Sequence, residues 1–382
     1  MSKSLSVKIL FAGGGTGGHL YPAIAIANKI AELLKDRAET DIAFVGTKRG
    51  LEYRLGDELG YPLYLISMRG ITRSLTLKNL FVPFMVMLAL VQSAMLLSKF
   101  RPDMVVGTGG YVSWPVLKMA AVLGILTVLQ EQNSFPGVAT RSAAAKAKRI
   151  YLGFEEARTY LKTAALMIVT GNPVRSEIAN GSRQRANEHF KLNPDKKTIL
   201  VLGGSQGARA INNAVIKSLE KNNWAGDVQL LWQSGKREYK EVNEKTAQLN
   251  WDGALFPFAA NMDDVYAASD VVIARAGALT LAELIECNLP SILIPFPYAE
   301  GDHQKKNALS LSSSQRAVLL NESQLGEVDI LCEAVTLMNS EKYTQIKHAL
   351  LKLTKDRKPA VEVIADDIVS LIDDSKEAGS ES

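Results

Sequence analysis

One ionisable side chain, His19, closes a run in which residues 13, 14, 15, 17 and 18 are all glycine. The apolar residues 7–12 before it are typical of a buried parallel strand. Pro22 and the apolar pattern after it predict a helix over residues 23–34. A strand-to-helix turn of this kind offers backbone amides and the positive end of a helix dipole to an anion. His19 would meet the ligand there as a general base, and the alternative is a structural histidine that caps the helix.

The glycine run satisfies the dinucleotide-binding pattern G-x-G-x-x-G, but the sequence argues against NAD. In that pattern a carboxylate near the end of the second strand holds the ribose. The second predicted strand, residues 42–45, is followed by Gly-Thr-Lys-Arg at residues 46–49 and by no carboxylate. No group of His, Asp and Glu residues has the spacing of metal ligands either. We therefore predict an anion-binding loop that needs no metal and no other cofactor.

Two further glycine-rich loops also follow predicted strands. In residues 107–111, Gly-Thr-Gly-Gly-Tyr, the glycines serve either tight packing or a second phosphate contact. Residues 203–207 precede a predicted helix, and Ser205 and Gln206 offer hydrogen-bond donors above its N-terminus. Several such loops together predict a phosphate-rich ligand.

Polar side chains in the second half of the chain could contact the rest of this ligand. Residues 271–274 predict a strand, and the helix pattern after it contains Thr280 and Glu283 at the spacing of a capping box. A cap would give Glu283 a local structural role; the alternative is a carboxylate that accepts hydrogen bonds from a ribose diol. Gln304 and Asn307 open another helix pattern and either bind sugar hydroxyls or form an ordinary helix start.

Apolar strands and helix patterns alternate, which is typical of parallel sheets covered on both faces, with ligands beyond the carboxyl ends of the strands. The pattern breaks at residues 171–175 and restarts at residue 198. With 382 residues, we predict an α/β protein of two Rossmann-like domains facing each other across a cleft. The domains are residues 1–171 and 172–358, and a helix at about 359–373 packs back on the first, followed by a frayed tail. The predicted strands are 7–12, 42–45, 103–106, 126–129, 150–153, 198–202, 228–232, 254–258, 271–274 and 291–295.

Residues 80–97 depart from the pattern of a plain soluble enzyme, because they form an 18-residue run without a charge. Three interpretations stay open: a buried covering helix, an exposed apolar face that docks on an anionic membrane surface, and a true span. The net charge of +4 is too mild to indicate a nucleic-acid partner, and two cysteines favour a reducing cytoplasm. The basic residues that flank the run are Arg69, Arg73, Lys78, Lys99 and Arg101.

These motifs, in this order, resemble the MurG family of peptidoglycan glycosyltransferases over nearly the whole chain. Any one motif is modest support, and all of them in register are specific. The motifs are Gly14-Gly15-Thr16-Gly17-Gly18-His19 with Pro22, Gly109-Gly110-Tyr111-Val112, Glu131-Gln132-Asn133 with Pro136-Gly137, Gly171-Asn172-Pro173-Val174-Arg175, Gly203-Gly204-Ser205-Gln206-Gly207-Ala208, Gly277-Ala278-Leu279-Thr280 with Glu283, and Gln304 with Asn307.

The resemblance implies a GT-B fold and an inverting, metal-independent hexosyltransferase. Such an enzyme moves N-acetylglucosamine (GlcNAc) from UDP-GlcNAc to the muramyl-pentapeptide diphospho-undecaprenol, lipid I, and forms lipid II for peptidoglycan, and so for cell shape and division. The resemblance also implies a peripheral protein on the cytoplasmic face of the bacterial inner membrane, with residues 80–97 as its membrane-facing patch. Other cell-wall synthesis proteins are compatible partners, and nucleic acid is not.

The resemblance further implies roles for single residues, with His19 as the base. Thr16, Gly17, Gly18 and Asn133 would lie near the donor sugar or the acceptor diphosphate. Arg175, Ser205 and Gln206 would face the donor diphosphate, Glu283 the ribose and Gln304 the GlcNAc. The remaining substrate-binding positions are Ala278, Leu279, Thr280 and Ala259, whose backbone would hold the uracil.

The chain departs from the family pattern at two places. After Phe258 the family expects an isoleucine and two acids, where this chain has Ala259, Ala260 and Asn261. Gln130 replaces the histidine that usually precedes the Glu-Gln-Asn motif, so no role is assigned to it.

Two other classes of function remain open on the sequence. One is another UDP-sugar enzyme of this fold, such as a lipid or natural-product glycosyltransferase or a non-hydrolysing epimerase, which acts without an acceptor. The other is a non-catalytic membrane scaffold, which has no need of anion-binding loops or of His19.

Overall fold

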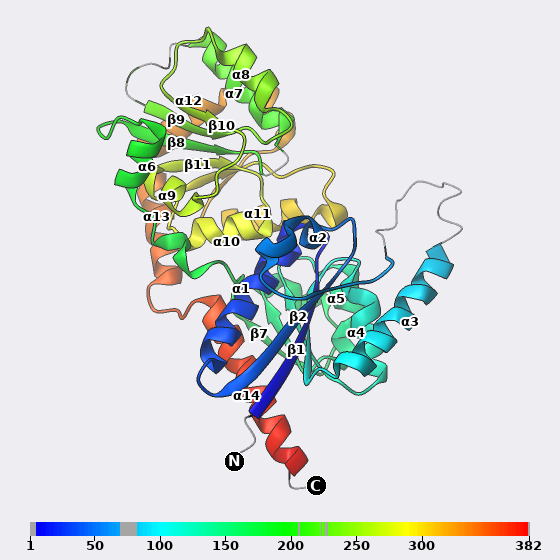
Figure 1. Ribbon diagram of the computed structural model, residues 1–382. Coiled ribbons are helices and arrows are strands. Elements are labelled where there is room, and N and C mark those ends of the chain that lie inside the picture. The colour runs from blue at the N-terminus through cyan, green and yellow to red at the C-terminus, as the bar shows by residue number, and fades with distance from the viewer. Residues whose placement is uncertain are drawn as a thin grey trace. The chain divides into compact units, whose positions relative to one another are not determined.

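The computed structural model describes residues 5–68, 82–204, 207–222, 224, 226 and 228–380 (Figure 1). The chain forms two compact units: unit 1 comprises Met1–Val174 with Lys358–Ser382, and unit 2 comprises Arg175–Arg357. Each unit contains one parallel β-sheet, which confirms the predicted α/β class. Of the residues singled out above, Arg69, Arg73, Lys78, Ser205 and Gln206 lie outside the described part of the chain, as do the first two residues of the uncharged run.

The sheet of unit 1 is buried on both faces. In its first strand Ile9 and Phe11 face a core layer formed with helices α1 (Gly17–Leu34) and α14 (Ala360–Ser380). Leu10 and Ala12 face the opposite layer, beside α3 (Val82–Phe100) and α4 (Ser113–Val122). Figure 1 shows α1 and α14 on one side of the sheet and α3 and α4 on the other. In spatial order the strands are β3 (Leu63–Leu65), β2 (Ala38–Gly46), β1 (Leu5–Gly13), β4 (Met104–Gly109), β5 (Leu126–Glu131), β6 (Arg149–Leu152) and β7 (Leu166–Val169); α2 (Leu51–Leu55) and α5 (Val138–Ala143) complete the α-helices described in this unit.

One face of the sheet of unit 2 packs on α7 (Arg209–Lys221), α12 (Ile330–Met338) and α13 (Glu341–Thr354). Its largest fully buried side chain is Trp232, whose indole N–H donates to Asn212 Oδ1 of α7 at 2.9 Å. In spatial order the strands are β10 (Gly253–Phe256), β9 (Val228–Gln233), β8 (Lys197–Leu202), β11 (Val271–Ala274), β12 (Ser291–Leu293) and β13 (Val318–Leu319). The other α-helices described here are α6 (Arg183–Phe190), α8 (Tyr239–Thr246), α9 (Met262–Ala268), α10 (Ala278–Glu286) and α11 (His303–Ser313).

The helix after the first glycine run starts earlier than predicted. α1 begins at Gly17, so the predicted start at Pro22 is wrong, and His19 lies in the first turn of the helix rather than on the loop. The amides of His19 and Leu20 both bond the carbonyl of Thr16, and Leu20 is fully buried. Core packing therefore sustains a helical turn in which the two glycines have low intrinsic helix propensity.

The C-terminal helix also extends further than predicted. α14 continues to Ser380, so the frayed tail expected after residue 373 is wrong over this range. The ion pairs Arg37–Asp373, at 2.9 Å, and Lys376–Asp103, at 3.4 Å, join this part of the helix to the rest of unit 1. Asp373 and Lys376, which look like part of a solvated tail in the sequence, thus pair with side chains that directly precede β2 and β4.

Candidate functional site

The predicted anion-binding loops lie where the strand order of each sheet reverses. The reversal falls between β1 and β4 in unit 1 and between β8 and β11 in unit 2. Open parallel sheets bind ligands beyond the carboxyl ends of their strands at this point. In unit 1 these strands lead into residues 13–18 and 107–111, and in unit 2 into residues 203–207 and 275–280. Each unit therefore has a candidate ligand-binding region at its own reversal point.

The imidazole of His19 fills the space above a glycine at the end of β4. Its Nδ1 is 3.1 Å from Thr16 Oγ1. A Cβ built on Gly109 would lie 2.7 Å from Cδ2 and 3.2 Å from Nε2 of this ring. Gly109 has φ of +98°, a conformation that glycine adopts without strain. When Nδ1–H donates to Thr16, Nε2 keeps the lone pair that a general base needs.

A buried carboxylate that the sequence analysis missed holds the first glycine-rich loop. Glu52 of α2 is 0% exposed and accepts hydrogen bonds from the amides of Gly15, at 2.8 Å, and Thr47, at 2.9 Å. A Cβ on Gly46 or Gly50 would lie 2.3 or 1.9 Å from this side chain. These two glycines around a glutamate are the sequence signal for it. The carboxylate lies at the end of β2, where the dinucleotide-binding pattern has a carboxylate for the ribose. Here it instead accepts hydrogen bonds from the protein's own loop.

Buried amide side chains connect the end of β5 to the backbone of His19. Gln130 donates to Asn172 Oδ1 at 3.0 Å, and Asn172 donates to the Gln132 carbonyl at 2.8 Å. Gln132 in turn donates to the Thr108 carbonyl at 2.7 Å, and the Thr108 hydroxyl donates to the His19 carbonyl at 2.9 Å. Gln130 is 0% exposed, so this departure from the family pattern belongs to a buried network.

Asn133 is presented by a turn that a second buried carboxylate organises. Glu131 accepts from the amide of Asn133 at 3.0 Å and from the amide of Gly137 at 3.1 Å. Burial raises the pKa of Glu131, and hydrogen bonds from Thr140 and from these amides oppose the rise. The carboxylate thus fixes the backbone on either side of the predicted Asn133 contact.

In unit 2, Glu283 lies on α10, behind the loop that follows β11. Its Oε2 accepts a hydrogen bond from the hydroxyl of Tyr266, on α9, at 2.7 Å. Burial raises the pKa of Glu283, and the bond from Tyr266 and the positive charge of Arg175 oppose the rise. The structure therefore brings together two predicted substrate-binding residues, Arg175 and Glu283. Tyr266 was not found from the sequence, because nothing in its spacing connects it with Glu283.

The capping role considered for Glu283 is wrong. α10 begins at Ala278 after the cap residue Gly277, and no side chain caps it. Thr280 is already inside the helix, so the Thr280–Glu283 spacing is not a capping box. Ala278, Leu279 and Thr280 instead form the first turn of α10, where the positive end of the helix dipole favours an anion.

At two other predicted substrate contacts, Ala259 and Gln304, one polar group is already hydrogen-bonded within the protein. The amide of Ala259 donates to Oε1 of the buried Gln233 at 3.1 Å, so a uracil contact at Ala259 would use its carbonyl oxygen. The amide of Phe296 donates to Oε1 of Gln304, on α11, at 2.9 Å. This bond orients the Gln304 amide so that Nε2 is the atom that can face a sugar.

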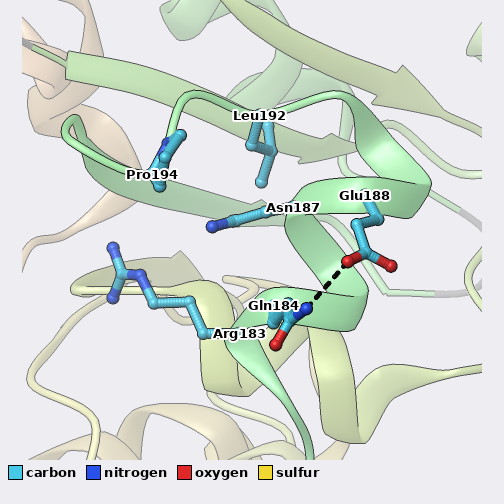
Figure 2. Close-up of a pocket in the computed structure, with 6 residues that line it drawn as sticks. All are labelled: Arg183, Gln184, Asn187, Glu188, Leu192 and Pro194. Carbon is cyan, nitrogen blue, oxygen red and sulfur yellow. Dashed lines mark hydrogen bonds between the residues drawn. The ribbon is translucent and has the colours of Figure 1, made fainter.

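A surface hollow of about 450 Å³ lies beside α6 in unit 2 (Figure 2). Figure 2 shows Arg183 and Asn187 beside it, and Gln184 bonded to Glu188, at 3.0 Å. No predicted site residue lines this hollow, so it is not the candidate site. Over the described residues, no group of three or more His, Cys, Asp and Glu side chains could hold a metal ion.

The described part of the uncharged run lies in α3, and few residues of this helix are fully buried. Only 22% of the stretch Pro83–Phe100 is buried, so the interpretation as a buried covering helix is wrong. Its length and composition alone would also allow it to cross a membrane. Ser93 and Leu97 face the protein, and Gln92 bonds Ser67. The apolar stripe on the solvent side is formed by Phe84, Met87, Leu88, Val91 and Met95.

Comparisons with known proteins identify the family. The sequence matches the glycosyltransferase family 28 N-terminal domain over residues 9–152 and the C-terminal domain of that family over residues 198–363. A UDP-N-acetylglucosamine–N-acetylmuramyl-(pentapeptide) pyrophosphoryl-undecaprenol N-acetylglucosamine transferase of Flavobacterium psychrophilum is 40% identical over 97% of this chain and 99% of its own length. The chain belongs to this transferase family.

Further relatives of the family agree with this assignment. The transferase of the same name from Chlorobium limicola is 43% identical over 84% of this chain and 87% of its own. The crystal structure of MurG from Acinetobacter baumannii matches with a TM-score of 0.73 and 25% identity, and the match covers 96% of this chain and 99% of that one. The resemblance to the MurG family and the GT-B architecture predicted from the motifs are thereby confirmed, and the chain is a glycosyltransferase.

Proposed function

We propose that this chain transfers GlcNAc from UDP-GlcNAc to N-acetylmuramyl-(pentapeptide) pyrophosphoryl-undecaprenol, lipid I, to give lipid II and UDP. The observation that carries the proposal is 40% identity with a transferase of that name along 97% of the chain. The position of the glycine-rich loops at the two reversal points supports it, because a nucleotide diphosphate sugar and a lipid diphosphate both require anion sites.

The chemical step is an inversion at the anomeric carbon of GlcNAc. The acceptor hydroxyl oxygen attacks that carbon from the face opposite UDP while the bond to the β-phosphate oxygen breaks. His19 accepts the hydroxyl proton at Nε2, since Thr16 Oγ1 lies 3.1 Å from Nδ1 and can fix the tautomer. Thr16, Gly17, Gly18 and Asn133 line the path of the acceptor.

Unit 2 would hold the donor and stabilise the leaving UDP. The negative charge that grows on the diphosphate faces Arg175 and the first turn of α10. Glu283 accepts hydrogen bonds from the ribose, and the amide nitrogen of Gln304 donates to the GlcNAc. The carbonyl of Ala259 accepts from the uracil, because its amide is bonded to Gln233.

The same proposal includes a membrane-docked, metal-independent enzyme. The apolar stripe of α3 inserts shallowly into an anionic cytoplasmic leaflet, where lipid I would be presented, and Lys99 in the last turn of the helix and Arg101 just after it favour the lipid headgroups. Arg175 and the helix-turn amides supply the positive charge that a metal supplies in other transferases, so no metal or other cofactor is needed.

The test is transfer of labelled GlcNAc from UDP-GlcNAc to a short-chain lipid I analogue in buffer with a chelator, for the wild type and His19→Ala. We expect transfer by the wild type and a loss of about 10²–10⁴-fold in the variant. An intact rate in His19→Ala would remove the base but keep the reaction. Donor binding without transfer to this acceptor would refute lipid I as the substrate, and turnover of the donor alone would indicate an epimerase.

A further inference from the structure

The carboxylate of Glu283 is held from behind by a tyrosine that has no other role in the proposed reaction. The Tyr266 ring is 2% exposed and comes from α9, while Glu283 comes from α10. The hydroxyl donates to Oε2 of Glu283 at 2.7 Å. A free glutamate side chain has several rotamers of similar energy, and a bond to a rigid buried ring selects one of them.

The chemistry of the tyrosine suits a permanent donor. Burial raises the pKa of Tyr266 well above its ordinary value, and the neighbouring carboxylate of Glu283 adds to the rise. The phenol therefore stays protonated and can only hold the carboxylate as an O–H donor. An ionised carboxylate has about four lone-pair directions, and the tyrosine uses one of them. Hydroxyls of a ligand can then bond to the remaining directions in a fixed geometry.

Two other residues near Glu283 do not orient its carboxylate. Arg175, which directly precedes the 3₁₀ turn Ser176–Ala179, lowers the pKa of Glu283 by its positive charge. Cys287, at the end of α10, bonds the Ile178 carbonyl at 3.3 Å, and burial raises the pKa of its thiol to about 12. Over the described residues, Tyr266 is the side chain that bonds Oε2, so the direction of the carboxylate depends on the tyrosine.

We infer that Tyr266 is a positioning residue for Glu283 and, through it, a determinant of selection for a ribonucleotide donor over a 2′-deoxyribonucleotide donor. The inference rests on the proposed function, in which Glu283 accepts hydrogen bonds from the donor ribose. A site built to bond a hydroxyl discriminates against an analogue that lacks it, provided that its acceptor is held in place.

The experiment measures kcat and KM of Tyr266→Phe with UDP-GlcNAc and with 2′-deoxy-UDP-GlcNAc. We expect the wild type to prefer the ribose donor by about tenfold or more in kcat/KM, as for a hydrogen bond to a charged group. In Tyr266→Phe this preference falls by about fivefold, through KM for the ribose donor, with kcat nearly unchanged. The midpoint of the pH dependence of this KM also moves to higher pH, because a bond that lowers the pKa of Glu283 is lost.

The chain provides a matched control. Tyr151 is also fully buried, and its hydroxyl donates to Asp367 Oδ2 at 2.8 Å in unit 1. Tyr151→Phe removes the same atom and the same type of bond, so its loss of melting temperature calibrates the structural cost. We expect Tyr151→Phe to keep the wild-type donor preference and pH midpoint.

A double variant tests whether Tyr266 acts on the donor preference through Glu283. In Glu283→Gln the donor preference is already lost, and adding Tyr266→Phe should reduce it no further. The role of Tyr266 would be overturned if Tyr266→Phe folds and keeps the wild-type donor preference and pH midpoint while Glu283→Gln loses the preference. That result would leave the proposed function standing. Absence of UDP-GlcNAc binding and transfer in the wild type would overturn the proposed function itself, and the inference with it.

Discussion

Placing a methyl group on Gly109 should displace His19, the proposed base. The new Cβ would lie 2.7 Å from Cδ2 of His19, and ordinary contacts begin at 3.4 Å. The imidazole must therefore move by about 0.7 Å, and a misplacement of about 1 Å can slow a positioned reaction by about 10²-fold. We expect Gly109→Ala to lower kcat by about 30- to 100-fold. The positive φ of +98° adds strain of about 1–2 kcal/mol, which lowers the melting temperature.

Gly124→Ala separates the strain from the displacement. Gly124 also has a positive φ, +70°, and a Cβ there would meet no atom within 4 Å. This control should lose stability and keep kcat in the assay of GlcNAc transfer to a soluble short-chain acceptor. In a His19→Ala background, Gly109→Ala should cause little further loss, because the displaced group is already absent. Equal losses of kcat with and without the imidazole would refute the reasoning.

Three other predictions concern the membrane, the donor and the first loop. Phe84→Ser with Met95→Ser removes side chains that are 71% and 67% exposed, so binding to anionic vesicles in a sedimentation assay should weaken by about 30-fold, or about 2 kcal/mol. Because burial raises the pKa of Glu283, KM for UDP-GlcNAc should begin to rise on acidification at a higher pH than for an ordinary glutamate, and the pH dependence should vanish in Glu283→Gln. By linkage, this group's contribution to stability is greatest at low pH and is lost as the pH rises through its raised pKa. Glu52→Gln replaces one of the two accepting oxygens by an NH2 group, which then faces a backbone N–H donor, and should lower the free energy of unfolding by about 2 kcal/mol in urea titrations.

Each of these has a control in the chain. Leu351→Ser, on α13 of unit 2, removes an apolar side chain that is 42% exposed and should leave vesicle binding unchanged, so equal weakening would contradict a role for the α3 stripe. The exposed neighbour Glu58→Gln should leave stability unchanged. A wild-type profile of KM against pH that persists in Glu283→Gln would assign the titration to another group.

The sequence predicted ten of the thirteen strands that the structure describes and missed the short strands β3, β7 and β13, and it predicted the supporting side chains poorly. Buried parallel strands are continuous apolar runs, so β1, β2 and β8 are readable from composition alone. α1 was misplaced because its first turn contains two glycines, and only the burial of Leu20 makes it helical. Local patterns fix elements but not contacts between them.

The functional residues divide along the same line. Among the candidate functional residues, His19, Glu283 and the glycines stand out because motif spacing marks them. Tyr266 and Glu52 do not, because each acts on a residue that is distant in sequence and adjacent only after folding. Even the Thr280–Glu283 spacing was a false signal, since α10 begins before Thr280.

The two carboxylates Glu52 and Glu283 explain why similar sheets should take different ligands. In unit 1, the fully buried Glu52 already accepts the amide of Gly15, so that amide is not available to a ligand. The first loop is left with the start of α1 and His19, which suits a hydroxyl to be deprotonated. In unit 2, Arg175 adds positive charge near Glu283, and Tyr266 orients that carboxylate. A nucleotide needs both an anion site and a ribose acceptor, and this pairing favours the donor in unit 2 and the acceptor in unit 1.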